Sequence, residues 1–112
     1  DMCWAWILNP LAAKDFLKKY LVSAPVNKLF GFGGDYGFVE PIVGHAYIAR
    51  KYISLAIAEL VDQGWFSLDD GLYAAKAIMC DNSTNTFDLK HKYKLLENTP
   101  WKAKPHHPEL IR

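Results

Sequence analysis

The residues best suited to chemistry in this chain of 112 residues are Asp35 and the two glycines before it, Gly33 and Gly34. They follow a short apolar run, residues 29–32, and an apolar run bounded by glycine is typical of a buried strand. Paired glycines let a ligand or another strand come close. A carboxylate at the carboxyl end of a buried strand lies where α/β sheets carry their chemistry. The alternative is a strand, a turn and an aspartate that only caps the turn.

His45 is the second candidate, because it follows Gly44 near the start of an expected long helix. This position places it at the same end of the strand layer as Asp35. A packed or surface histidine and a metal ligand both stay open as interpretations. Cys3 and Cys80 each lack a second cysteine nearby, which favours buried thiols over metal ligands. One carboxylate cannot form a tetrahedral site, so most ligands of any metal would lie outside this chain.

Three aromatic residues, Trp4, Trp6 and Tyr36, accompany the carboxylate in the expected strand layer. Aromatic side chains at strand ends usually pack in the core. The same three could line a substrate pocket, with ring faces stacking on the ligand and the Tyr36 hydroxyl donating a hydrogen bond. We keep both interpretations. A dinucleotide fingerprint is not formed, because its third glycine would fall on Tyr36, and no Lys-Ser or Lys-Thr pair follows for a phosphate loop.

The elements expected to position these residues alternate between strand and helix. Residues 1–8 are apolar after the first position and predict a strand with both tryptophans on one face. Asn9 and Pro10 predict the start of a helix that Pro25 ends. The strand at 29–32 follows. This order predicts a parallel βαβ unit with a right-handed crossover.

Two further helices are expected after the glycines. The first spans about 41–63, includes Val43 in its buried stripe and ends at Gly64. The second begins at a capping box on Ser67, includes Leu72 in its buried stripe and runs to about residue 80. Residues 90–112 hold six basic and two acidic side chains, three prolines and no sustained periodicity. They predict a weakly ordered basic tail after a first part at 1–89.

Length and composition limit the functional classes. A chain this short forms one domain at most, or part of a larger one. A net charge of +1 gives no reason to expect nucleic acid or a membrane as partner. Two cysteines, no signal peptide and no long apolar span predict a cytoplasmic location. Two parallel strands with so few helices leave sheet faces uncovered, which predicts a segment completed by the rest of a larger fold or by a homo-oligomer.

Taken together, residues 1–89 resemble the carboxyl-terminal part of an amidohydrolase-superfamily protein, of the amidohydrolase-2 and uronate-isomerase-like branch. The main matching pieces are DMCWAW (1–6), NKLFGFGGDY (27–36), VGHAYIAR (43–50), LVDQG (60–64) and IMCDN (78–82). The resemblance implies an α/β fold in which this segment forms the last two βα units and the terminal helix of a (β/α)8 TIM barrel.

The resemblance also implies a metal-dependent hydrolase. The family's eighth strand ends in an aspartate that binds a catalytic divalent metal, here expected to be zinc, and Asp35 matches this position. Trp4, Trp6, Tyr36 and His45 would then bind a small-molecule substrate. The metal would activate water for attack on a carbonyl-type carbon. The family's His-x-His pair has no counterpart here, so the segment alone should be inactive. The alternatives are a uronate-isomerase-like sugar-acid isomerase and a non-catalytic helical interaction module.

Overall fold

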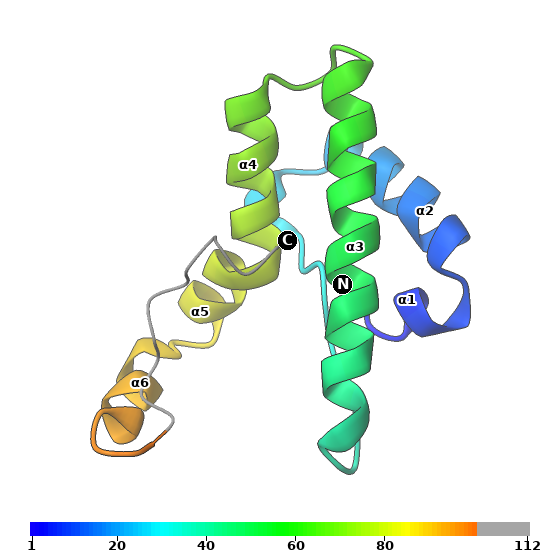
Figure 1. The fold of residues 1–112 in the computed structure, drawn as a ribbon. Coiled ribbons are helices and arrows are strands. Elements are labelled where there is room, and N and C mark those ends of the chain that lie inside the picture. The colour runs from blue at the N-terminus through cyan, green and yellow to red at the C-terminus, as the bar shows by residue number, and fades with distance from the viewer. Residues whose placement is uncertain (101–112) are drawn as a thin grey trace.

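The computed structural model describes residues 1–100, which form helices joined by turns and one extended segment (Figure 1). These residues contain no β-strand. The predicted α/β architecture, and with it the placement in a (β/α)8 barrel, is therefore wrong. In chain order the helical elements are α1 (Ala5–Leu8), α2 (Pro10–Ser23), the 3-10 turn η1 (Val26–Lys28), α3 (Glu40–Asp62), α4 (Leu68–Lys76), the π-helical turn η2 (Ala77–Asp81), α5 (Asn82–Thr86) and α6 (Lys90–Leu96).

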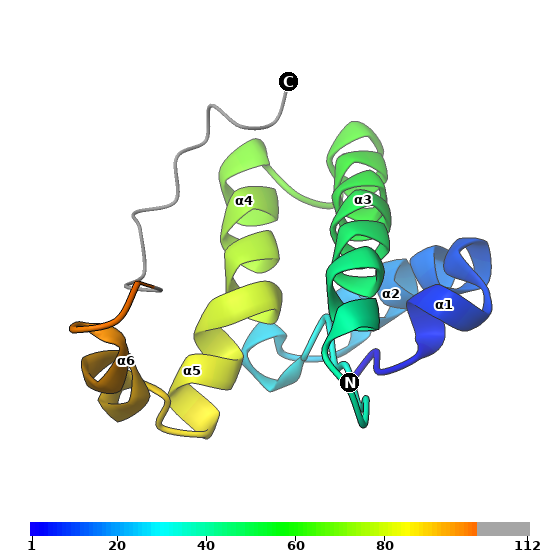
Figure 2. The same ribbon diagram turned by 60° about the horizontal axis from the view of Figure 1, so that its bottom comes forward.

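The longest helix, α3, is the centre of the fold and packs against α2 on one side and α4 on the other (Figures 1 and 2). Its buried residues recur every three or four positions, the spacing that gathers side chains on one face of a helix. They are His45, Ala49, Ile53, Ala56, Ile57 and Leu60. The helix predicted at about 41–63 is confirmed.

The predicted helix boundaries are also confirmed, because each rests on a local capping signal. The Asn9 side chain accepts a hydrogen bond from the backbone N–H of Ala12 at 3.0 Å and caps α2. Gly64, directly after the last turn of α3, adopts a φ of 75°, which favours glycine. Ser67 and Asp70 form the reciprocal capping box at the start of α4.

Residues 1–8, predicted as a strand, form a turn and the short helix α1 instead. Trp4 adopts a φ of 60° in that turn. The two tryptophans then part: Trp6 is fully buried, whereas Trp4 remains 38% exposed. The difference is geometric, because residues two apart share a face in a strand but point in different directions in a helix.

Residues 29–32 are extended and largely buried, as predicted, but no strand lies beside them. Their backbone groups bond to helical elements instead. The indole N–H of Trp6 donates to the Gly31 carbonyl oxygen at 2.8 Å. The Gly31 N–H donates to the carbonyl oxygen of Ile78 in η2, also at 2.8 Å. The chain's own helices thus cover this segment, and the predicted sheet with uncovered faces does not form.

The π-helical turn η2 explains how the middle of a helix can supply an acceptor. Asn82 donates its backbone N–H to Ala77, five residues back. In an α-helix that N–H would bond to Ile78, so the wider turn leaves the Ile78 carbonyl free for Gly31. The Asn82 side chain donates two more hydrogen bonds, both of 2.7 Å, to backbone carbonyls in and next to the extended segment.

The region beyond Leu89, predicted as a weakly ordered tail, contains the short helix α6, which has no buried residue. Figure 2 shows α6 beyond α5, on the far side of α4 from α3. Residues 101–112 lie outside the described residues. The division into a first part at 1–89 and a weakly ordered tail therefore stays a prediction.

Candidate functional site

Three of the five predicted site residues lie together beside the first turns of α3. The hydroxyl oxygen of Tyr36 lies 3.1 Å from Nδ1 of His45, and the ring centroids of Trp4 and Tyr36 are 5.1 Å apart. Phe32 packs edge-on against His45, with 4.8 Å between ring centroids. We define these four residues as the aromatic cluster. It combines Phe32, at the end of the extended segment, with the partly buried polar pair of Tyr36 and His45.

His45 is the chemically unusual member of the aromatic cluster. Its side chain is 1% exposed, and Nε2 has no hydrogen-bond partner within residues 1–100. Burial lowers the pKa of His45, because surroundings poor in water disfavour the charged imidazolium. A neutral imidazole carries one N–H, so Nδ1 either accepts the Tyr36 hydroxyl proton or donates to that oxygen. The geometry fits a neutral, packed histidine, and its role in substrate binding stays a prediction.

The other two predicted site residues lie apart from the aromatic cluster. Trp6 is fully buried and bonds to the backbone of Gly31. Asp35 is exposed, adopts a φ of 47°, and its carboxylate makes no hydrogen bond or ion pair within residues 1–100. It therefore lies in an exposed, irregular part of the backbone and not at the end of a strand. The sequence signal for it was the pair of glycines, Gly33 and Gly34, and neither adopts a positive φ.

The described residues give Asp35 no set of neighbouring metal ligands. Among residues 1–100, no three His, Cys, Asp or Glu side chains are arranged to hold a metal ion. Cys3 and Cys80 are free thiols, and Cys80 is exposed where a buried thiol was predicted. The zinc and hydrolase assignments stay predictions, and the barrel on which they rested is absent from the described part of the chain.

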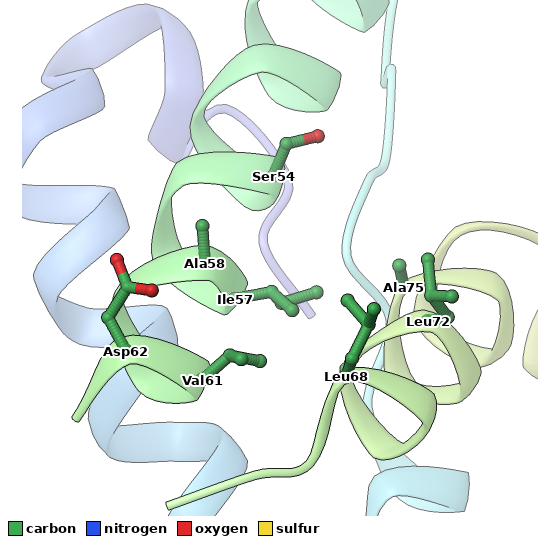
Figure 3. Close-up of a pocket in the computed structure, with 9 residues that line it drawn as sticks. Ser54, Ile57, Ala58, Val61, Asp62, Leu68, Leu72 and Ala75 are labelled. Carbon is green, nitrogen blue, oxygen red and sulfur yellow. The ribbon is translucent and has the colours of Figure 1, made fainter. Parts of the chain in front are cut away.

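An open apolar groove lies between α3 and α4 (Figure 3). Its volume is about 310 Å³. We define it as the α3/α4 groove. Its apolar side chains come from both helices, and Figure 3 shows those of Leu68 and Leu72 on the α4 side facing Ile57 and Val61 on the α3 side. The apolar lining residues are Ile57, Ala58, Val61, Leu68, Leu72 and Ala75.

A glycine in α4 sets the depth of the α3/α4 groove. A Cβ atom added at Gly71 would lie 2.9 Å from Ile57 Cγ2 and 3.1 Å from Val61 Cγ2, so the two helices touch at this level. Leu68 and Leu72, which flank Gly71, remain 65% and 62% exposed. The helices thus meet at the floor of the groove, while two leucines stand on its open side.

The charges near the α3/α4 groove are acidic. Asp62 lines it and is the only charged residue among the side chains that do so. Asp70 lies in the first turn of α4, where hydrogen bonds from Ser67 lower its pKa. Lys14 and Lys18 of α2 lie on the side of α3 that faces α2, where their ammonium groups bond to the Glu59 carboxylate. These hydrogen bonds lower the pKa of Glu59.

The exposed apolar surface continues from the α3/α4 groove along α3. Val39, Val43 and Tyr47 follow one another at four-residue steps and are 72%, 76% and 70% exposed. Ser54 and Ala58 of the groove continue the same face, because steps of four and seven residues stay on one side of a helix. We define these five residues as the α3 stripe. Its first three members are thus largely exposed within residues 1–100.

Sequence reasoning placed Val43 and Leu72 in buried stripes, yet both are exposed. One signal could have identified the groove in advance. Both α3 and α4 carry apolar residues on more than one face, and a single packing contact can bury only one of these faces. The number of apolar residues in α3 and α4, larger than one packing contact can bury, is the sequence feature that indicates a binding surface.

A search among known proteins found no family model that matches the chain, and neither a curated protein nor a solved structure matched it. The resemblance to the amidohydrolase superfamily therefore stays a prediction. Within residues 1–100 no helix combines the length and apolar character needed to cross a membrane.

Proposed function

We propose that the chain is a non-catalytic helical interaction module that binds an amphipathic helix in the α3/α4 groove. One observation carries the proposal: Leu68 and Leu72 are exposed side by side across an open groove from an apolar face of α3. Large exposed apolar surfaces mark sites of interaction. A groove between two packed helices accepts a third helix through apolar side chains spaced at i, i+3, i+4 and i+7.

The leucines provide enough binding energy for this role. Complete burial of a leucine contributes about 1.5–3 kcal/mol. Scaled to the 65% and 62% exposure of Leu68 and Leu72, the two together contribute about 2–4 kcal/mol when a ligand covers them. This amount changes a dissociation constant by a factor of roughly 30 to 1,000. Loss of either leucine should therefore be easy to measure.

The charge of the α3/α4 groove indicates the class of helix that it favours. Its single charged lining residue is Asp62, and Asp69 lies nearby in the first turn of α4. A helical ligand with lysine or arginine beside its leucines would complement these carboxylates. Complementary charge chiefly sets partner choice and association rate, whereas apolar burial supplies affinity.

The proposal is tested with a synthetic amphipathic peptide that has leucines on one face and lysines on the other, labelled with a fluorophore. We expect saturable binding by anisotropy, and we expect Leu72→Glu to weaken it at least tenfold. Leu95→Glu is the matched control, because Leu95 is 74% exposed but lies in α6, outside the groove. Circular dichroism of each variant confirms that the helices remain.

Two results would overturn the proposal. One is the absence of saturable binding by the unaltered chain. The other is an equal loss of binding in Leu72→Glu and Leu95→Glu, which would show that any exposed leucine attracts the peptide. A second peptide with glutamates in place of lysines tests the charge preference separately, and it should bind more weakly at low ionic strength than at high.

A further inference from the structure

We propose that residues 33–38 form a pH-sensitive latch, which closes over His45 at neutral pH and opens locally when His45 takes up a proton. We define residues 33–38 as the latch. They lead from the extended segment to the start of α3 and include Asp35 and Tyr36. The inference goes beyond the proposed function, because it does not depend on a ligand in the α3/α4 groove.

Side chains hold the latch in place, and its backbone does not. Within residues 1–100 no hydrogen bond between two backbone groups involves residues 33–38. In the same part of the chain, the one side-chain hydrogen bond of the latch lies between the Tyr36 hydroxyl and His45 Nδ1. The Tyr36 ring also packs on Trp4, and Gly33 packs against Cys3. A segment with so few hydrogen bonds is able to open while the helices around it stay folded.

Backbone strain on both sides of Tyr36 favours opening. Asp35 in the latch and Trp4, which packs on Tyr36, adopt positive φ angles of 47° and 60°. Among the other non-glycine residues of the described chain, only Asp88 has a positive φ. Such conformations are costly and persist where the contacts around them hold the backbone in place. Loss of the contacts of Tyr36 would therefore allow the backbone at Asp35 to relax.

A proton on His45 destabilises the closed latch, because both ring nitrogens of an imidazolium carry hydrogen. Nδ1 is still able to donate to the Tyr36 oxygen, 3.1 Å away. Nε2 is buried and has no acceptor within residues 1–100. A buried charged group without a complete set of hydrogen bonds is unfavourable. Opening of the latch admits water, which solvates the charge and accepts the hydrogen bond from Nε2.

Burial sets the direction of the pH dependence. It lowers the pKa of His45 in the closed state, and no charged group contributes to this shift. The titratable side chains next to His45 along the elements that surround it are Asp1 and Cys3 before α1, Asp35 and Tyr36 in the latch, and Glu40 in the first turn of α3. Asp1, Asp35 and Glu40 are exposed. In the open state the pKa of His45 returns toward its ordinary value of about 6.5, so opening is favoured as the pH falls below that value.

The test is NMR spectroscopy of the isotope-labelled full chain between pH 7.5 and pH 5. We expect the His45 ring and the backbone amides of residues 33–38 to titrate with one midpoint. The nuclear Overhauser contacts between the rings of Trp4 and Tyr36 should be lost across the same transition, while the amide signals of α4 keep their folded positions.

Three variants identify the group responsible. His45→Phe keeps a ring in place but takes up no proton, so the latch should stay closed down to pH 5. His91→Phe is the matched control, because His91 is exposed in α6, and it should leave the transition unchanged. Tyr36→Phe keeps the ring contact with Trp4 but removes the hydrogen bond to His45. It should raise the ratio of open to closed latch about threefold to tenfold at a given pH and move the midpoint to higher pH.

Three results would overturn the inference. One is persistence of the contacts between Trp4 and Tyr36 down to pH 5, whether or not His45 takes up a proton. Another is the same pH-dependent loss of these contacts in His45→Phe, which would assign the transition to a different group. The third is loss of the folded α4 signals at the same midpoint, because the chain would then unfold as a whole. If His45→Phe does not fold, an unchanged midpoint in Tyr36→Phe overturns the inference on its own.

Discussion

The side-chain amide of Asn82 holds the extended segment against η2, and its removal gives a sharp test of the fold. Asn82 is 7% exposed, and its Nδ2 donates to the carbonyl oxygens of Val26 and Leu29, each at 2.7 Å. Both partners are acceptors, so the nitrogen of the amide and not its oxygen must face them. This one side chain thereby bonds to two backbone carbonyls that lie 56 and 53 residues earlier in the chain.

Asn82→Ala should lower the free energy of unfolding by about 2–4 kcal/mol. The buried Leu29 carbonyl would be left without a donor, which costs about 1–3 kcal/mol, whereas the Val26 carbonyl would lose one hydrogen bond, worth about 0.5–1.5 kcal/mol, and keep the Leu29 N–H as a donor. The bond to Leu29 is buried and the bond to Val26 is partly buried, so the first contributes the larger share. For a domain of this size the melting temperature should fall by roughly 10–20 °C. Urea denaturation measures the same loss at constant temperature.

Asn82→Asp should be more harmful than Asn82→Ala at pH 7, and its effect should depend on pH. The introduced carboxylate would face two carbonyl oxygens without a proton to donate, which raises the pKa of this carboxyl in the folded state. Because the pKa of this carboxyl is higher in the folded than in the unfolded state, the variant regains stability as the pH falls through the folded-state pKa toward the unfolded-state pKa of about 3.9. The alanine variant has no such group, so its deficit against the unaltered chain should not change with pH.

The measurement is urea unfolding of both variants at pH 7 and pH 4.5, each compared with the unaltered chain at the same pH. Asn85→Ala is the control, because Asn85 lies in the same helix but is exposed, and its effect should stay within about 0.5 kcal/mol. A deficit of Asn82→Asp that is equal at both pH values, together with a cost below about 1 kcal/mol for Asn82→Ala, would refute the role of the amide.

Three further predictions follow from the structure. Gly31→Ala places a Cβ atom 3.0 Å from a core isoleucine and should cost about 1–3 kcal/mol in urea unfolding, whereas Gly37→Ala, with no atom within 4 Å, should be tolerated. Two lysines lower the pKa of Glu59, so stability is lost as the pH falls below about 4.3 through that pKa, and Glu59→Gln should remove this part of the acid profile of the melting temperature. Burial lowers the pKa of His45, so stability is lost as the pH falls below about 6.5. His45→Phe should therefore flatten the dependence of the melting temperature on pH between pH 7 and pH 5. An unchanged slope would show that the ring accepts a proton without cost to stability.

The features predicted correctly from the sequence are those that depend on neighbours along the chain. Asn9, Gly64 and Ser67 each mark a helix end, because a cap is formed by residues within one turn of it. Tyr36 and His45 are also neighbours along the chain, nine residues apart across the start of α3, although the sequence argument had placed His45 beside Asp35. Short separation leaves few alternative arrangements.

The strands were predicted wrongly because their evidence was local and their hydrogen-bond partners are not. An apolar run that ends in glycines indicates buried, extended backbone, and residues 29–32 have both properties. The run does not reveal which donors and acceptors it meets. Trp6 and Ile78 supply them here, and the second does so only because η2 departs from α-helical geometry. Neither partner can be found by periodicity within a window of sequence.

The extended segment and the α3/α4 groove depend on the same pair of helices, so stability and binding should be coupled. Gly31 packs between Ile53 of α3 and Ile78 of η2, while Gly71 sets the contact between α3 and α4 on the groove side. The two contacts together fix the distance between α3 and α4 at the groove. A groove that is already formed lowers the free-energy cost of ordering its side chains when a ligand binds. Asn82→Ala, which loosens the segment without touching the groove, should therefore weaken peptide binding at a temperature where the variant is still folded. Unchanged affinity would show that the contact at Gly71 alone sets the walls.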